Sequence, residues 1–284
     1  MLPAESVFTD TSIQTEIDSE DSRIMHALSA AALAGGRVVR DRFLNGGFDV
    51  EEKTSESDLV TTVDRGVERV IRDILAATVP DATIIGEEAS GDDNSSIVDR
   101  GAGVVYVDPV DGTMNFVHGF HEVAVSIGYW KDDTPYAGVV LNPVSNDLYW
   151  AMAGMGAYRN GKRIHVSDTT SVETALLASG WPYDRYSLPR AIRTVQHLVP
   201  LCREVRVIGS AALAVCYVAA GVFDGFWEYS LSPWDLAGAI AIAREAGAVC
   251  VSPDGSVFRL HEGNVLVANA GVYSEIVSQL NTVQ

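Results

Sequence analysis

Apolar residues recur at helical spacing near the start of the chain. Over 22–44 they fall three and four positions apart, which predicts an amphipathic helix with arginines on its outer face. The stretch 63–78 has the same spacing, and Asp64 lies at its start, where the helix dipole favours a carboxylate. Residues 1–20 show no period and are rich in Ser, Thr, Asp and Glu, so we expect a mobile acidic tail there.

Short apolar runs predict a series of strands in the next part of the chain. Residues 83–85 form one such run, and Val104–Val107 form a second that reads as fully buried. We expect Pro109 to end the second strand, because proline has no N–H and a fixed φ. Paired strands are expected at 122–130 and 136–142, with further hairpins after them. The half 21–167 is therefore predicted to be α+β, with a mostly antiparallel sheet.

Strands and helices alternate from about residue 168 onward. Strands are expected at 174–179, 205–208, 223–228, 248–251 and 265–268, and helices at 188–202, 211–220, 236–247 and 272–280. Such alternation is typical of an α/β arrangement. We therefore predict a second half, 168–284, of the α/β class.

Composition and charge limit what the chain can do. Its 284 residues are 47% hydrophobic and 20% charged, which is enough for a large globular core. No apolar run has membrane-spanning length and no signal-peptide pattern is visible, so we expect a cytoplasmic protein that binds no membrane. The three cysteines are widely spaced and read as reduced core residues. A net charge of −18 disfavours nucleic-acid binding. The same charge would repel a phosphorylated substrate unless cations at the site neutralise it.

Candidate chemistry is concentrated in the stretch Asp108-Pro109-Val110-Asp111-Gly112-Thr113. Two carboxylates lie at the end of a buried strand, followed by bare backbone N–H groups at Gly112 and Thr113. Hard oxygen ligands beside an anion-binding backbone suit a metal-bound phosphate. The alternative is an ordinary turn in which Asp108 caps a helix and Asp111 is solvated. Glu87 and Glu88 follow the preceding strand, so two acidic strand ends converge if the strands are neighbours.

Other polar residues have a structural and a functional interpretation. Asp64 and Asp235 both read as carboxylates at helix starts, and Ser210 reads as a helix N-cap. His118 and His121 have the spacing of a zinc pair, although the acidic neighbours favour surface or substrate-rim positions.

Taken together, these segments resemble the inositol monophosphatase family of magnesium-dependent phosphatases over roughly residues 50–270. The stretch Asp108–Phe116 is similar to the family's DPIDGTxNF, and 85–88 is similar to its IGEE. Residues 58–64 are similar to DLVTxxD, and 234–237 with 245–247 to WDxA and EAG. The departures are mild, since Val110 replaces Ile and Ala248 follows EAG where Gly is common. The resemblance implies a layered αβαβα sandwich of the sugar phosphatase type.

The resemblance also implies roles for individual residues. Glu87, Asp108 and the Val110 carbonyl would hold one Mg²⁺. Asp108, Asp111 and Asp235 would hold a second, and Glu87 with Asp64 a weaker third. The N–H groups of Gly112 and Thr113 would bind phosphate, while Thr113 with Asp64, or Glu87, would orient a metal-activated water. Asp235 would assist the leaving alkoxide. The residues expected to face substrate hydroxyls are Gly209, Ser210, Ala211 and Glu228, and Lys53 corresponds to a family lysine near the site.

The implied activity is Mg²⁺-dependent, Li⁺-sensitive hydrolysis of a small phosphate monoester, with inositol 1-phosphate as the expected substrate. Histidinol phosphate is the main rival substrate, and fructose 1,6-bisphosphate and 3′-phosphoadenosine 5′-phosphate are further ones. Family members are commonly dimers, so we expect a homodimer. A non-catalytic regulatory protein on the same scaffold is the alternative from another class, and the presence of every acidic ligand disfavours it.

Overall fold

The computed structural model describes residues 19–52, 59–88 and 103–283. The predicted tail lies outside these ranges, except for Ser19 and Glu20, which begin the first helix. Lys53, Asp58 and the loop expected at 90–103 also lie outside them, apart from Gly103.

The first half of the chain contributes two long helices and the larger sheet. Helices α1 (Ser19–Asn45) and α2 (Thr62–Thr78) flank a small antiparallel pair, β1 (Val50–Glu52) and β2 (Leu59–Thr61). Within the described residues, seven strands form the larger sheet in the order of the chain: β3 (Thr83–Gly86), β4 (Val104–Asp111), β5 (Ala124–Lys131), β6 (Thr134–Asn142), β7 (Asp147–Met152), β8 (Gly156–Arg159) and β9 (Lys162–Ile164). Strands β3 and β4 are parallel, and all later neighbours are antiparallel.

The second half forms a smaller mixed sheet with helices between its strands. In the described chain, this sheet has the order β11-β10-β12-β14-β13, with bounds β10 (Leu176–Ser179), β11 (Glu204–Val207), β12 (Gly225–Glu228), β13 (Val249–Val251) and β14 (Val265–Ala268). The helices are α4 (Leu188–Leu198), α5 (Ala211–Ala219), α6 (Pro233–Glu245) and α7 (Tyr273–Asn281), with 3₁₀ turns at Val172–Thr174 and Leu260–Glu262. Strand β10 pairs in parallel with β11 and β12, as the α/β pattern predicts.

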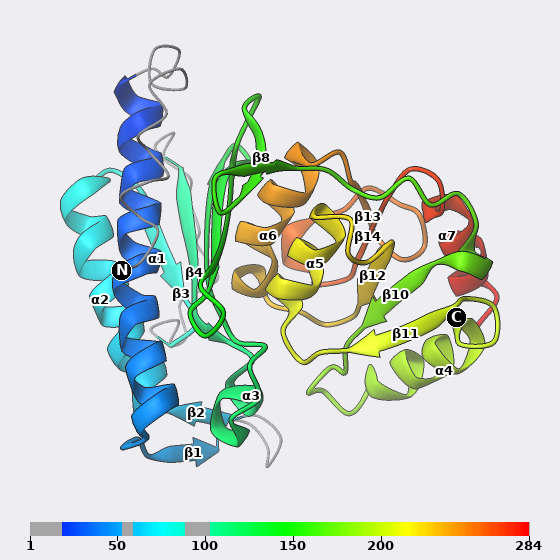
Figure 1. Ribbon diagram of the computed structural model, residues 1–284, viewed down its shortest axis with the longest axis horizontal. Helices are drawn as coiled ribbons and strands as arrows, with labels where there is room; N and C mark the ends of the chain where they lie inside the picture. Colours follow the sequence, from blue (N-terminus) through cyan, green and yellow to red (C-terminus); the bar gives the residue numbers. More distant parts are fainter. Residues whose placement is uncertain (1–18, 53–58, 89–102, 284) are drawn as a thin grey trace.

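The helices and sheets stack as an αβαβα sandwich (Figure 1), which confirms the predicted layering. Helices α1 and α2 cover one face of the larger sheet, and α5 and α6 fill the space between the two sheets. Helices α4 and α7 cover the far side of the smaller sheet. Helix α5 is apolar nearly all round, as a helix between two sheets must be. No helix in the described ranges combines the length and apolarity needed to cross a bilayer.

Three glycines bring α6 unusually close to the larger sheet. A Cβ on Gly238 of α6 would lie 2.8 Å from Ser126 Oγ and 2.9 Å from the Ile127 carbonyl oxygen. Added Cβ atoms on Gly128 and Gly138 would overlap the α6 backbone in turn. The Trp130 indole Nε1 donates to the Ala237 carbonyl at 3.1 Å. This close packing brings the first turn of α6, which contains Asp235, towards the end of β4.

Strand β4 continues through Pro109, so the prediction that it ends there is wrong. It runs to Asp111, and its pairing with β5 shifts register between Asp108 and Asp111. An irregularity of this kind leaves residues out of the ladder, which is where a sheet tolerates a proline without an N–H. The turn instead comes at Gly112, whose φ of 87° favours glycine, and α3 (Thr113–His118) follows.

Candidate active site

The end of β4 buries the first of the predicted ligands. Asp108 is 2% exposed, and its Oδ1 accepts the backbone N–H of Val110 at 3.0 Å. Burial raises the pKa of Asp108 well above its usual value. The charges of four carboxylates raise it further: Glu87, Asp111, Asp235 and Asp64. A cluster of this kind is stable in its ionised form only with a compensating cation.

Asp111 joins the two halves of the molecule. Its carboxylate accepts the Ser210 hydroxyl and the N–H groups of Ala211 and Ala212, at 3.2 and 3.0 Å. Asp111 is therefore buried at the start of α5, and the alternative of a solvated side chain is wrong. Burial raises its pKa to about 6, although these hydrogen bonds lower it. Ser210 is also the α5 N-cap, since its Oγ accepts the Leu213 N–H at 3.2 Å.

Asp64 has one oxygen in a helix cap and the other turned towards β4. Oδ2 accepts the N–H of Thr61 at 2.9 Å and also its hydroxyl, as half of a capping box. Oδ1 lies 3.1 Å from Thr113 Oγ1, which is also 3.0 Å from the Val110 carbonyl oxygen. The single Thr113 proton is shared between these two acceptors. Burial raises the pKa of Asp64 in spite of its hydrogen bonds.

Glu228 and Asp235 come from the second half of the chain. Glu228 ends β12, is buried, and accepts no side-chain hydrogen bond from the described residues. Burial raises its pKa well above the usual value, and Asp235 and Asp111 add to the effect. The bare Cα of Gly180 makes room for this carboxylate, which an added Cβ would overlap. Asp235 Oδ2 accepts the Ser232 N–H at 2.7 Å, completing the capping box of α6.

The turns at Gly112 and Gly209 pack against each other. A Cβ on Gly112 would lie 2.8 Å from the Glu122 carbonyl oxygen and 3.1 Å from that of Gly209. Asn115 Nδ2 donates to the carbonyls of Glu122 and Ile208, both at 2.8 Å. Gly209 has a φ of 74°, and its missing side chain leaves space for the Asn115 amide. We assigned Asn115 no role from sequence, although its place in the motif Asp108–Phe116 is a signal for one.

His118 and His121 do not belong to the acidic cluster. Both side chains are exposed, and the His121 ring packs against Phe43 with 5.6 Å between ring centroids. In 19–52, 59–88 and 103–283, no three His, Cys, Asp or Glu side chains converge tightly enough to form a complete metal site as they stand. The hydrogen bonds above account for this, because Asp64, Asp111 and Asp235 each direct an oxygen to a helix start. The donor set, all carboxylate and carbonyl oxygen, nevertheless fits Mg²⁺.

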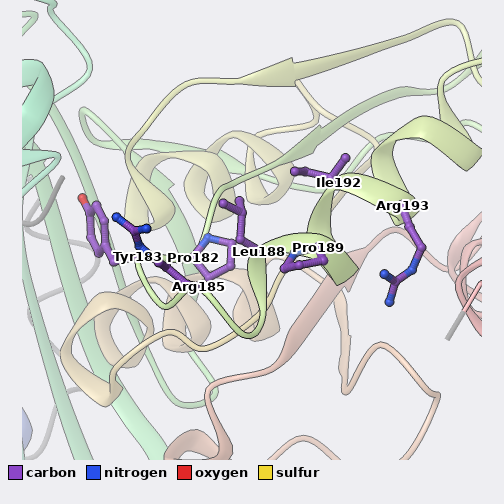
Figure 2. A pocket seen from close by; sticks show the side chains of 7 residues that line it. All are labelled: Pro182, Tyr183, Arg185, Leu188, Pro189, Ile192 and Arg193. Carbon is purple, nitrogen blue, oxygen red and sulfur yellow. The ribbon is translucent and has the colours of Figure 1, made fainter. Parts of the chain in front are cut away.

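A surface hollow lies at the loop after β10 and the start of α4. Figure 2 shows its lining, which includes Tyr183, Arg185, Ile192 and Arg193. The loop is fastened near the end of β12, since Ser187 Oγ lies 2.6 Å from Ser230 Oγ. The Arg190 guanidinium also stacks over the Tyr229 ring at 4.3 Å. The hollow contains none of the clustered carboxylates, so we place the chemistry at β4.

Comparison with known proteins gives a consistent result. The model of the inositol monophosphatase family matches residues 20–284. An inositol-1-monophosphatase of Synechocystis is 34% identical over 275 residues, covering 96% of this chain and 91% of the relative. A fructose-1,6-bisphosphatase/inositol-1-monophosphatase of Aquifex aeolicus is 35% identical over 237 residues, covering 80% of this chain and 84% of the relative.

Solved structures share the whole fold. The extragenic suppressor protein suhB of Bartonella henselae superposes with a TM-score of 0.82 at 30% identity, covering 90% of this chain and 98% of that chain. An IMPase of Thermotoga maritima gives 0.81 at 30% identity, covering 92% and 98%. These matches are to phosphatases, the class of hydrolases that cleave phosphate monoesters. The chain belongs to the inositol monophosphatase family, which confirms the resemblance seen in its motifs.

Proposed function

We propose that this protein hydrolyses inositol 1-phosphate to inositol and phosphate in a Mg²⁺-dependent reaction. The observation that carries the proposal is the buried carboxylate cluster around Asp108, whose members raise the pKa of that residue together. Bound cations would stabilise the ionised carboxylates of such a cluster. The cluster lies beside the backbone turn at Gly112, which is expected to bind phosphate. The inositol-1-monophosphatase names of relatives that share most of this chain's length support the choice of substrate.

The metal ligands we propose are those implied by the family motifs. Glu87, Asp108 and the Val110 carbonyl would hold one Mg²⁺, Asp108, Asp111 and Asp235 a second, and Glu87 with Asp64 a third. When bound, Mg²⁺ supplies positive charge that offsets the carboxylates and stabilises the attacking and leaving oxygens. Asp111 would exchange part of its contact with α5 for this role, because its oxygens now accept hydrogen bonds there.

The chain's own groups bind the phosphate and move protons. The N–H groups of Gly112 and Thr113 would donate to phosphate oxygens at the start of α3. The Thr113 hydroxyl is within hydrogen-bond distance of Asp64 Oδ1, so Thr113 would take a proton from the attacking water as it passes its own proton to the Asp64 carboxylate. Glu87 is the alternative group for orienting that water. As the water oxygen bonds to phosphorus and the ester bond breaks, Asp235 would help the alkoxide to collect a proton.

The second half would recognise the alcohol. The Glu228 carboxylate would accept hydrogen bonds from substrate hydroxyls, since it is buried without a donor among the described residues. Gly209, Ser210 and Ala211 would line the same side. A cationic amine would also suit Glu228, which keeps histidinol phosphate as the alternative substrate. The Aquifex relative's name supports testing fructose 1,6-bisphosphate as well.

We also propose a division of the chain into halves, an inhibitor, an oligomeric state and a location. We propose halves at 21–167 and 168–284, supported by sheets that lie wholly within each range. Inhibition by Li⁺ and a homodimeric state are proposed from the family resemblance alone, and a cytoplasmic location from the sequence pattern alone.

A substrate panel tests the proposed function. Purified protein with Mg²⁺ is assayed on inositol 1-phosphate, histidinol phosphate, fructose 1,6-bisphosphate and 3′-phosphoadenosine 5′-phosphate. We expect the highest kcat/KM with inositol 1-phosphate. A large preference for histidinol phosphate would replace the substrate assignment. If Mg²⁺ left every phosphomonoester intact, the non-catalytic alternative would stand instead.

A further inference from the structure

An ion pair between a buried glutamate and a partly exposed arginine lies beneath the strand end that presents Glu87. Glu68 of α2 is 2% exposed, and its Oε1 accepts Arg72 Nε at 2.7 Å, one helical turn further on. Its Oε2 accepts the backbone N–H of Glu88, also at 2.7 Å. Both carboxylate oxygens are thus engaged, so Glu68 supports the site without being an available ligand itself.

The pair contacts β3 on both sides of Glu87. Arg72 Nη1 donates to the Ile84 carbonyl at 3.1 Å, while Glu68 receives the N–H that follows Glu87. Gly86 lies directly on the Glu68 carboxylate, and any Cβ there would overlap it. From the other side, the Glu87 N–H donates to the Val107 carbonyl of β4 at 3.2 Å. The backbone of Glu87 is therefore held between α2 and β4.

Stability alone does not explain a charged pair at this position. Removing the Glu68 carboxylate from water is costly, and apolar residues in place of a buried ionic group often stabilise a protein as well or better. Here the pair makes directional contacts to the Ile84 carbonyl before Glu87 and to the Glu88 N–H after it, which apolar side chains would not reproduce. Groups that orient a metal ligand are commonly worth 10- to 100-fold in metal affinity.

We propose that Glu68 and Arg72 are positioning residues that fix Glu87 for cation binding. The proposal rests on the proposed function, because it takes Glu87 to be a Mg²⁺ ligand. Helix α2 then contributes twice to the site, through Asp64 at its first turn and through this pair in its middle.

Calorimetric Mg²⁺ titration of folded variants tests the proposal, with urea unfolding in chelator as a parallel measurement. We expect Glu68→Ala to weaken Mg²⁺ binding about 10- to 100-fold. Glu68→Gln keeps an acceptor for the Glu88 N–H, so we expect a smaller loss and a folded protein even if alanine is not tolerated. Glu51→Gln is the matched control. It breaks the exposed ion pair between Glu51 of β1 and Arg65, which lies in the same helix as Glu68, and Mg²⁺ affinity should not change.

Arg72→Gln distinguishes positioning of Glu87 from the direct electrostatic effect of the Arg72 charge on cation binding. Removing a positive charge near the site should tighten cation binding if only electrostatics matter, whereas loss of the Ile84 contact should weaken it. We expect weaker binding. Tighter binding in Arg72→Gln, or unchanged affinity in a folded but less stable Glu68→Ala, would overturn the positioning role while leaving the proposed function intact. Wild-type protein that binds no Mg²⁺ would overturn both.

Discussion

The acidic cluster should make the metal-free protein less stable as its carboxylates ionise. Asp111 shows the effect most clearly, because burial raises its pKa from the usual 3.8 to about 6. A raised folded-state pKa means that the folded protein binds the proton more tightly than the unfolded chain does. The resulting stability is fully present below pH 3.8 and is lost as pH rises through 6.

The size of the effect follows from this pKa shift. A rise in the pKa of Asp111 from 3.8 to about 6 corresponds to about 3 kcal/mol of unfolding free energy, at about 1.36 kcal/mol for each pH unit. Burial also raises the pKa of Asp64, Asp108 and Glu228, so they act in the same direction. Asp147 acts oppositely: burial raises its pKa, but hydrogen bonds led by Arg159 hold it below the usual value. Its contribution is lost only as pH falls below about 4, outside the window of Asp111.

The measurement is urea unfolding in EDTA at pH 4, 5, 6 and 7, for wild type and Asp111→Asn. The amide cannot ionise, so the difference between the profiles reports the ionisation of Asp111, together with its effect on the pKa of Asp108 and Glu228. We expect wild type to lose about 3 kcal/mol more than the variant between pH 4 and 7, and Mg²⁺ to restore wild type at pH 7. Superimposable profiles, or a wild-type stability that rises relative to the variant, would refute the reasoning.

Three further substitutions test separate parts of the account. Asp64→Asn should lower kcat about 100-fold, while the affinity of the tightest Mg²⁺ site should change by no more than a few-fold. A large calorimetric change in that affinity would contradict the role of Asp64 in orienting the attacking water. Glu228→Gln should raise KM for inositol 1-phosphate about 10-fold without altering Mg²⁺ dependence; equal losses on every substrate would count against it. Gly238→Ala, whose Cβ meets Ser126 at 2.8 Å, should cost about 1–3 kcal/mol in urea unfolding. The control Gly66→Ala has open space in α2 and should gain about 0.5–1 kcal/mol, so equal effects would disprove the packing argument.

Local patterns predicted the elements well because each is encoded by neighbouring residues. The apolar spacing over 22–44 anticipated α1 closely, and the alternation after residue 168 anticipated the smaller sheet. Pro109 was misjudged because its effect depends on β5, which pairs with β4 through a register shift that accommodates it. Such accommodation comes from the partner strand and is invisible in the proline's own neighbourhood.

The convergence of the site could be predicted only through the family resemblance. Asp111 and Ser210 are 99 positions apart, and their contact depends on how α5 packs between the sheets. Asp235 reaches β4 because Gly238 permits a close backbone approach, which no local period reveals. The two interpretations of Asp64 prove compatible in geometry, since one oxygen caps α2 and the other accepts from Thr113. The sequence assigned Glu68 no role, because its contact with the Glu88 N–H joins residues 20 positions apart.

Phosphate release from inositol 1-phosphate by wild type and Asp108→Asn, each with Mg²⁺ and with excess EDTA, is the most direct test of the central claim. Asp108 is buried, the neighbouring carboxylates raise its pKa, and we propose that it bridges two cations. We predict release by wild type only with Mg²⁺, and a rate for the variant at least about 10³-fold lower at matched folded protein. Release that persists in EDTA, or a variant as active as wild type, would contradict the account.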